Sequence, residues 1–341
     1  MLRLRWNSIV CCAAVISAAC GSGVIPETLP SAAATDSSSI RVTKHSFQSA
    51  SLGVAKTYYI YLPTNYDSEP TRQWPVLYLL HGMTQDETAW PIQGRLGAIA
   101  DAAAFQAIVV MPDGDNSFYS NSATPMNYQA CLAKGVGLLD PRVDHATACV
   151  RTPKYEDYIV GDLIAEIDGH YRTKPERAAR GIAGLSMGGF GAFMLAMRHT
   201  ELFSAAASHS GVLTLLFAGP YPYRRGDVRL VDNVVTWGED IGVFGRWFRG
   251  LFGAQRDTWL SHDPSELAKQ LPVGALALYL DCGTEDEFVL YNGARYVHDL
   301  LLERGIEHQF YLGAGRHSFE FWQRRLPSSL KFFAAHFAER R

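Results

Sequence analysis

The hexapeptide GLSMGG at residues 184–189 constrains the fold of this chain more than any other stretch. It follows a short apolar run at 181–183 and precedes apolar residues that recur at helical spacing over 190–197, so the sequence predicts a strand, a sharp turn and a helix. A serine between glycines in such a turn is held in a strained backbone conformation, because a Cβ at the flanking positions would collide with the strand or the helix. This context makes Ser186 a candidate nucleophile; the alternative is an incidental serine in a glycine-rich turn.

Apolar runs alternate with segments of helical spacing along the rest of the chain, which is the pattern of a parallel sheet covered by helices. The runs predicted as strands lie at residues 76–80, 107–111, 181–183, 205–207, 275–280 and 308–312, with an antiparallel edge strand at 56–62. The predicted helices span residues 96–104, 158–171, 190–197, 296–304 and 320–339. The sequence therefore predicts one α/β domain over residues 45–341, with a mostly parallel central sheet flanked by helices.

Two segments interrupt this alternation, at residues 117–154 and 212–270. Both follow predicted strand ends, so both are expected over the carboxyl edge of the sheet, where ligands bind in open α/β folds. The second segment is rich in aromatic side chains, most of which we expect to pack a small core of its own and a few to contact an apolar ligand. We therefore predict two cap insertions above the sheet.

The first residues have the composition of an export signal. A short basic head precedes an uncharged stretch at 8–19 that is too short to span a bilayer, so residues 1–19 are predicted to be a secretory signal peptide. Cys20 stands where bacterial signals carry a cysteine that is lipidated, and cleavage before it without lipidation is the alternative. Residues 20–44 are predicted to be a flexible tether. The protein is therefore expected in a bacterial cell envelope, with a possible lipid attachment to the membrane, or secreted.

The cysteines fit an exported protein. Cys131 and Cys149 lie in the first insertion, and such a pair in an oxidising compartment predicts a disulfide that closes the loop between them. Cys282 directly follows a predicted strand and is expected to be a buried thiol.

Charge and composition argue against two other classes of function. A net charge of -3 and a pI near 6.4 give no electrostatic basis for binding nucleic acid. No cluster of His, Asp and Glu has the spacing of metal ligands, and the DGDN sequence at 113–116 lacks the further ligands of a calcium loop. We therefore predict no metal and no cofactor.

A nucleophilic serine needs a base, an acid that orients the base, and donors for the developing oxyanion. His317 lies in the glycine-rich loop 313–318, between the last predicted strand and the last predicted helix, which is where the base is expected. By contrast, His298 and His336 fall within predicted helices and His308 within a predicted strand. His317 is therefore the candidate base.

Several acidic side chains crowd the turn after the strand at 275–280, namely Asp281, Glu285, Asp286 and Glu287. Asp281 ends the strand and is expected to be structural, accepting backbone N–H groups of the turn. Asp286 has the reach to meet Nδ1 of the candidate base, but spacing alone does not separate it from Glu285 or Glu287.

The oxyanion hole requires two backbone N–H groups. Met187, directly after the candidate nucleophile, is predicted to supply one of them. Met83, in the loop after the strand at 76–80, is predicted to supply the other, because Gly82 lets the chain turn inward. His81 ends that strand and is expected to shape the loop rather than to act as a ligand or a second base.

Several motifs occur together and in order, at residues 76–83 with Trp90, 111–119 (MPDGDNSFY), 155–158 (YEDY), 184–189, 281–288 (DCGTEDEF) and 315–317 (GRH). In combination, from about residue 45 to 338, they resemble the esterase D family of α/β-hydrolases, which includes S-formylglutathione hydrolases, feruloyl and tributyrin esterases and mycolyltransferases. The resemblance implies an α/β-hydrolase fold with cap insertions. It also places the acid on the second Asp of the family's D-x-G-x-x-D-x-F motif, which here is Asp286.

Two departures from the family bear on the substrate. S-formylglutathione hydrolases are cytosolic, whereas this chain carries a predicted export signal. Mycolyltransferases carry Asp-Gly before the oxyanion loop and an adjacent Arg, whereas residues 81–84 read HGMT here, so hydrolysis is favoured over transfer to a sugar. We therefore expect an exported serine carboxylesterase for a small-molecule acyl or aromatic ester. The alternatives are an acyltransferase of the mycolyltransferase type and a non-catalytic envelope protein on the same fold.

Overall fold

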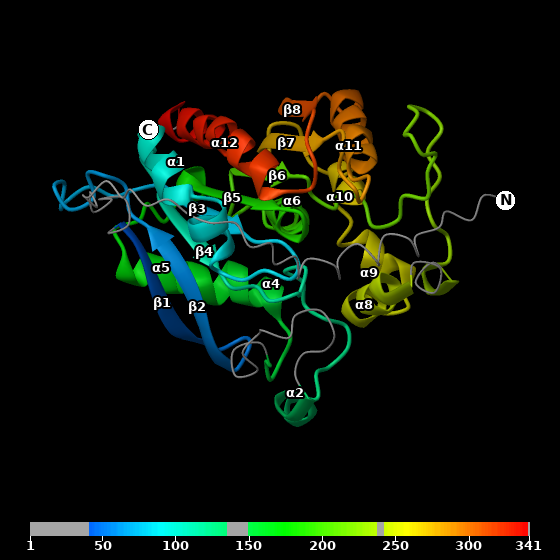
Figure 1. Ribbon diagram of the computed structural model, residues 1–341, viewed down its shortest axis with the longest axis horizontal. Coiled ribbons are helices and arrows are strands. Elements are labelled where there is room, and N and C mark those ends of the chain that lie inside the picture. The colour runs from blue at the N-terminus through cyan, green and yellow to red at the C-terminus, as the bar shows by residue number, and fades with distance from the viewer. Residues whose placement is uncertain (1–40, 135–148, 237–241, 340–341) are drawn as a thin grey trace, which may run out of the picture.

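The computed structural model describes residues 41–134, 149–236 and 242–339 of the chain. Within these ranges a sheet of 8 strands has the order β1-β2-β4-β3-β5-β6-β7-β8 (Figure 1). The strands are β1 (Val42–Ser49), β2 (Val54–Tyr61), β3 (Val76–Leu80), β4 (Ile108–Pro112), β5 (Arg180–Leu185), β6 (Ala205–His209), β7 (Ala277–Gly283) and β8 (His308–Gly313). All pairs from β4 to β8 are parallel, whereas β1–β2 and β2–β4 are antiparallel. The mostly parallel sheet is confirmed.

β1 is the strand that the sequence pattern did not predict. It lies at the edge of the sheet, where it pairs with β2 alone, and most of its side chains are exposed and polar. A strand in such a place needs no apolar face, so the alternation that identifies strands is weak. Residues 42–44, which the prediction assigned to the tether, therefore belong to β1. The predicted signal peptide, Cys20 and the tether up to residue 40 lie outside the described residues.

Helices cover both faces of the sheet (Figure 1). One face carries α1 (Leu96–Ala102) and α12 (Phe319–Glu339), together with the short η4 (Ala89–Gln93). The other face carries α6 (Met187–Arg198), α11 (Tyr291–Glu303) and a continuous helical segment made of α4 (Tyr155–Asp157), η5 (Tyr158–Leu163) and α5 (Ile164–His170), and η6 (Arg177–Ala179) leads into β5. No helix in the described part of the chain combines the length and the apolarity needed to cross a bilayer.

The two predicted insertions contain short helices that sequence periodicity did not reveal. These are α2 (Tyr128–Lys134) in the first insertion, and α8 (Gly242–Phe252), α9 (Arg256–Leu260) and α10 (Pro264–Ala268) in the second. Phe252 and Trp259 pack ring against ring at 5.6 Å, and Phe248 meets Phe118 of the first insertion at 4.9 Å. The aromatic residues of the second insertion therefore build a local core, as predicted, and that core also contacts the first insertion.

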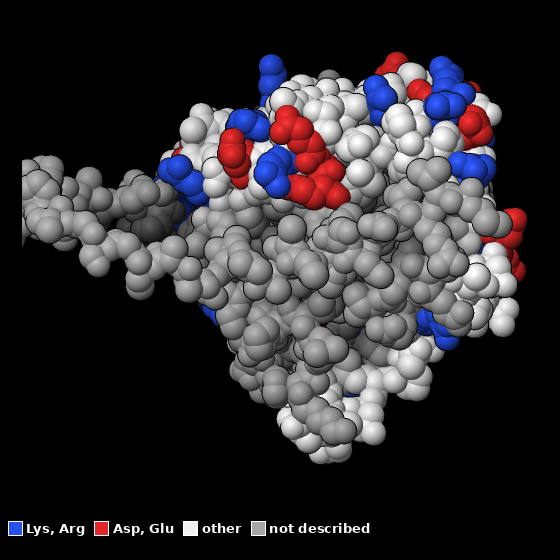
Figure 2. Space-filling view, turned by 45° about the vertical axis from the view of Figure 1, so that its right-hand side comes forward, with Lys and Arg blue, Asp and Glu red and all other residues white. Residues whose placement is uncertain are grey.

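Charged side chains of both signs lie near one another on the described surface that Figure 2 shows.

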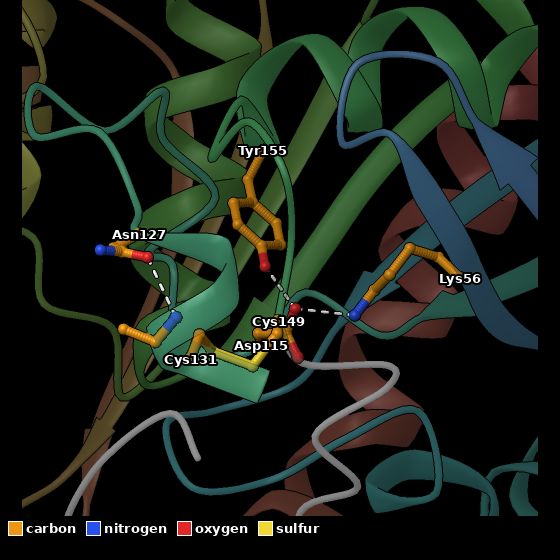
Figure 3. Close-up of a disulfide and its surroundings, with 7 residues drawn as sticks. Lys56, Asp115, Asn127, Cys131, Cys149 and Tyr155 are labelled. Carbon is orange, nitrogen blue, oxygen red and sulfur yellow. Dashed lines mark hydrogen bonds and ion pairs between the residues drawn. A yellow bond between two sulfur atoms is a disulfide. The ribbon is translucent and has the colours of Figure 1, made fainter. Parts of the chain in front are cut away.

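Cys131 on α2 and Cys149 form the predicted disulfide, with their Cα atoms 5.7 Å apart (Figure 3). Cys282 is a free and buried thiol, as the sequence predicted.

Removal of this disulfide is expected to destabilise the protein by about 3 kcal/mol, because the covalent link limits the freedom of the unfolded loop between the two cysteines. The measurement is the thermal midpoint of the Cys131→Ser/Cys149→Ser variant beside the wild type, each with and without a reducing agent. We expect the reducing agent to lower the midpoint of the wild type to that of the variant and to leave the variant unchanged. Equal midpoints for the oxidised wild type and the variant would contradict the prediction.

Candidate active site

Ser186 lies in the predicted sharp turn between β5 and α6. Its backbone has φ 53° and ψ −117°, an unusual conformation for a residue other than glycine. A Cβ on Gly184 would lie 2.3 Å from the carbonyl oxygen of Gly188, and a Cβ on Gly188 would lie 2.4 Å from that of Leu80. The glycines are therefore required by close backbone approach. The turn leaves Ser186 at the N-terminus of α6, whose dipole favours negative charge.

His317 connects the Ser186 hydroxyl to an acid. Its Nε2 lies 2.9 Å from Ser186 Oγ and its Nδ1 lies 2.6 Å from Asp286 Oδ2. The Asp286 side chain is fully buried and that of His317 is 10% exposed. Because a carboxylate accepts the proton of Nδ1, Nε2 carries a lone pair that can accept the serine proton. The structure thus brings the three predicted residues into one hydrogen-bonded chain.

Asp286 is itself held by its surroundings. The backbone N–H of Phe288 donates to Oδ1 at 2.9 Å. Cys282 Sγ lies 3.8 Å from Oδ2, and burial together with the charge of Asp286 raises the pKa of this thiol, so the thiol is protonated and donates. Cys282 lies on β7, and the turn after that strand brings Asp286 back to its thiol, a contact that the sequence did not indicate.

The neighbouring carboxylates have other partners. Glu287 accepts the backbone N–H of His317 at 3.0 Å and pairs with the Arg316 guanidinium, so it holds the loop that carries the base. Burial raises the pKa of Glu287, but the His317 amide and Arg316 outweigh this effect and the pKa is lowered. The Glu285 side chain is exposed. Asp286 is therefore the acid that meets His317, which spacing alone did not decide.

Asp281 is structural, but its predicted partners are wrong. Its buried Oδ2 accepts from the Tyr279 hydroxyl at 2.8 Å and lies 2.9 Å from His209 Nδ1, so side chains and not backbone N–H groups of the turn bind it. The backbone oxygen of His209 in turn accepts the N–H of Ser186 at 2.9 Å. Asp281 therefore fixes the end of β6 beside the candidate nucleophile.

The other late histidines contact groups away from Ser186. His298 Nδ1 lies 2.7 Å from His308 Nε2, and His336 Nε2 lies 2.8 Å from Ser204 Oγ. Within the described ranges, no group of three or more His, Cys, Asp and Glu side chains could hold a metal ion.

The oxyanion loop, defined here as Gly82–Thr84, lies against the candidate nucleophile. A Cβ on Gly82 would be 2.6 Å from Leu185 Cδ1 and 3.4 Å from Ser186 Cβ, so the loop packs closely against the turn that carries Ser186. No hydrogen bond from the backbone N–H of Met83 or Met187 to another described residue is found. Both amides are thus available to a substrate oxygen, and both methionines line the same cavity as Ser186.

His81 holds this loop from behind. The backbone N–H of Gly114 donates to its Nε2 at 2.9 Å, so its Nδ1 carries the proton and donates to the Gly82 oxygen at 2.8 Å. Both ring nitrogens are therefore occupied by backbone groups, and His81 shapes the loop as predicted.

A buried charge cluster lies next to His81 and was not predicted. Lys56 Nζ is 2.6 Å from Asp113 Oδ2 and 2.7 Å from Asp115 Oδ2. The Tyr155 hydroxyl donates to Asp115, and Figure 3 shows Lys56 and Tyr155 both pointing toward that carboxylate. Burial would lower the pKa of Lys56, but the two carboxylates raise it well above its ordinary value. Burial and the adjacent Asp113 raise the pKa of Asp115 to about 6. The signal in the sequence was the position of Lys56 on the same face of β2 as the buried Tyr58.

An apolar cavity of about 160 Å³ opens at Ser186. It is lined by Met83, Phe118, Ser186, Met187, Val212, Leu213, Thr214, Leu215, Phe217, Tyr221, Phe248, Phe288, Val289, Leu290, Asn292 and Gly293. None of these side chains carries a full charge, and its polar members include Asn292, whose amide binds the backbone of Tyr223 and Val289. The cavity can therefore bury an apolar group of a molecule whose reacting carbonyl lies at Ser186.

Comparison with known proteins shows which family this chain belongs to. The Esterase family model, described as "Putative esterase", matches residues 49–333. An endo-1,4-beta-xylanase/feruloyl esterase of Xylanibacter ruminicola is 31% identical over 184 residues, which are 51% of this chain and 21% of that protein. The chain spans between 21% and 33% of the length of the first curated relatives it matches.

Solved structures show the same fold. A ferulic acid esterase matches with a TM-score of 0.59 and 22% identity, over 87% of this chain and 98% of that one. An S-formylglutathione hydrolase from Agrobacterium tumefaciens matches with a TM-score of 0.61 and 20% identity, over 86% of this chain and 94% of that one. These matches confirm the α/β-hydrolase fold, and the family match confirms the resemblance drawn from the motifs. The chain belongs to the esterase family of α/β-hydrolases.

Proposed function

We propose that this protein is an exported serine carboxylesterase that hydrolyses an acyl or aromatic ester through an acyl-enzyme intermediate. The observation that carries the proposal is the hydrogen-bonded chain Ser186–His317–Asp286 at the mouth of an apolar cavity. The family supports ester hydrolysis as the type of reaction, and the two free backbone amides beside Ser186 support stabilisation of an oxyanion.

The reaction follows from these positions. His317 Nε2 takes the proton of Ser186 as Oγ attacks the ester carbonyl, and the Met83 and Met187 amides stabilise the tetrahedral oxyanion. The C–O bond to the alcohol then breaks, and His317 returns its proton to the leaving oxygen. Water repeats the sequence on the acyl-enzyme and releases the acid. Asp286 keeps the proton of the imidazole on Nδ1 throughout.

The cavity supports an apolar acyl group. An apolar protein cavity of about 150 Å³ can bind benzene, so a cavity of this size holds about six carbons as a chain or a ring. One relative is named a feruloyl esterase and a structural neighbour a ferulic acid esterase, and the feruloyl group carries an aromatic ring of this size. We propose that the acyl side of the ester enters this cavity and that the alcohol faces solvent.

A series of p-nitrophenyl esters from acetate to dodecanoate tests the proposal. We expect kcat/KM to rise by about fourfold per methylene, which corresponds to ~0.8 kcal/mol of burial, until about six carbons fill the cavity, and then to stop rising. A p-nitrophenyl benzoate is expected to be a substrate, because its ring fits the same space. A constant kcat/KM across the series would contradict the acyl-binding part, and the absence of turnover with every ester would contradict the esterase itself.

Two further measurements separate the alternatives. Product analysis in the presence and absence of glycerol or trehalose distinguishes hydrolysis from acyl transfer, since a transferase would form the new ester.

The proposals of export and lipidation rest on the sequence of residues 1–20. The mass of the mature N-terminus from envelope fractions tests both, because a lipid on Cys20 adds the mass of its acyl chains.

A further inference from the structure

The residue that follows the predicted oxyanion donor has a strained backbone. Thr84, next to Met83, has φ 64°, in the left-handed region that a β-branched side chain disfavours. Such a conformation costs on the order of 1–3 kcal/mol and persists only where the surroundings hold it. A group that holds Thr84 in this conformation also fixes the direction of the adjacent Met83 amide.

Asn116 is the side chain that binds Thr84. Its Oδ1 accepts the backbone N–H of Thr84 at 2.6 Å, across 32 residues of sequence. The N–H of the strained residue thus has a fixed acceptor outside the oxyanion loop. This bond comes from the turn after β4, where Asn116 ends the DGDN sequence at 113–116.

The turn that presents Asn116 is itself rigid. Asp113 Oδ1 accepts the N–H of Asp115 at 2.9 Å, and Lys56 Nζ pairs with both carboxylates. Lys56 is fully buried, and the Asp113 and Asp115 side chains are 7% and 13% exposed. Figure 3 shows Lys56 and Tyr155 converging on Asp115 beside the disulfide. A turn fixed by buried charges can hold Asn116 in one place, which a mobile surface loop could not.

The same segment holds the other side of the oxyanion loop. The N–H of Gly114 donates to His81 Nε2 at 2.9 Å, and the Tyr119 hydroxyl donates to the His81 oxygen at 3.0 Å. Met83 therefore lies between two anchored residues, His81 before it and Thr84 after it, while its own N–H is not used within the described part of the chain.

We propose that Asn116 is a positioning residue for ester hydrolysis, which holds Thr84 in its strained conformation and thereby aims the Met83 N–H at the oxyanion. This inference rests on the proposed esterase function. An oxyanion donor stabilises the transition state only when it lies about 2.7–3.1 Å from the oxyanion. Relaxation of Thr84 would therefore reduce the stabilisation of the transition state and leave the binding of the ester unchanged.

The test compares Asn116→Ala with Asn127→Ala in the full chain. Asn127 Oδ1 also accepts a backbone N–H, that of Ala130 at 3.0 Å, but it caps α2 in the cap and does not contact the oxyanion loop. Asn116→Ala is expected to lower kcat by about tenfold or more with KM within twofold, since loss of a whole oxyanion donor costs about 10²–10³-fold. Asn127→Ala is expected to keep both constants within twofold of the wild type.

Two further measurements distinguish positioning from general damage. A trifluoromethyl ketone forms a tetrahedral adduct with the serine, so its affinity for Asn116→Ala is expected to fall by the same factor as kcat. Adding Thr84→Gly to Asn116→Ala is expected to restore part of the lost kcat, because glycine adopts φ near +64° without strain.

The outcomes are distinct. An active wild type with unchanged kcat in Asn116→Ala overturns the inference alone. The same holds if kcat falls while the affinity for the ketone is retained, or if Asn127→Ala loses as much. A wild type that hydrolyses no ester overturns the proposed function, and the inference falls with it.

Discussion

Replacement of Ser186 by alanine is expected to lower the kcat for p-nitrophenyl esters by about 10⁴-fold or more, because the covalent step has no other nucleophile in position. Ser186 Oγ is 2.9 Å from His317 Nε2 and lines the cavity, so its loss leaves the base without a hydroxyl to deprotonate. The measurement is kcat on the best ester of the series. Ser318→Ala is the matched control, since it removes a hydroxyl one residue from His317, and it should stay within a few-fold of the wild type. Turnover of Ser186→Ala within tenfold of the wild type would reject Ser186 as the nucleophile.

The backbone of Ser186 adds a second readout to the same experiment. Its φ of 53° strains any residue with a Cβ, so alanine keeps this strain whereas glycine removes it. Ser186→Gly is therefore expected to be as inactive as Ser186→Ala but more stable than it by about 1 kcal/mol. A higher thermal midpoint for the inactive glycine variant would show that loss of activity does not come from misfolding. A thermal midpoint of Ser186→Gly equal to or below that of Ser186→Ala would contradict the interpretation that this turn is strained.

The parts of the site that sequence could predict are the ones encoded locally. The turn at Ser186 is fixed by glycines within a few residues of it, and His317 is fixed by its place in a glycine-rich loop before the last helix. Residues 76–80 and 108–110 read as strands because both of their faces are buried, which leaves a continuous apolar run. For such elements the neighbours in sequence are also the neighbours in space.

Other parts depend on contacts between distant segments. β1 has few buried side chains, and its strand conformation comes from pairing with β2. The helices of the second insertion are held by rings such as Phe252, Trp259 and Phe190, of which the last lies on α6. Such pairings have no periodic signature, so periodicity located the insertions and did not reveal their helices.

The buried charge cluster illustrates the same limit in the site. Asp113 and Asp115 read as the carboxylates of a polar turn, and the cation that neutralises them, Lys56, comes from β2. Lys56 shares a face of β2 with Tyr58, but a buried lysine is uncommon, so the alternation of the strand does not indicate a buried ion pair. The bond from Asn116 to Thr84 joins two turns that follow different strands, so nothing in the sequence near either residue indicates it.

Spacing alone did not separate Asp286 from Glu285 and Glu287, and both the family resemblance and the structure assign the acid to Asp286. A substitution at Asp286 is therefore expected to have a large effect on kcat. Asp286→Asn is expected to lower kcat by about 10⁴-fold with little change in KM. The asparagine amide can donate to Nδ1 of His317, which places the imidazole proton on Nε2. That nitrogen then has no lone pair to accept the Ser186 proton. The measurement is kcat and KM on the ester used for the Ser186 variants.

Glu285→Gln and Glu287→Gln provide matched controls, because each removes one charge from the same turn. The exposed Glu285 side chain contacts none of the reacting groups, so its variant should keep the kcat of the wild type. Glu287 accepts the backbone N–H of His317 at 3.0 Å, and a glutamine can keep that bond while it loses the charge that pairs with Arg316. We therefore expect Glu287→Gln to lose only a few-fold, since an exposed ion pair contributes about 0–1 kcal/mol. If instead Glu287→Gln lost 10³-fold and Asp286→Asn less than tenfold, the base would be oriented by the exposed carboxylate, and the buried one would serve only the fold of the turn.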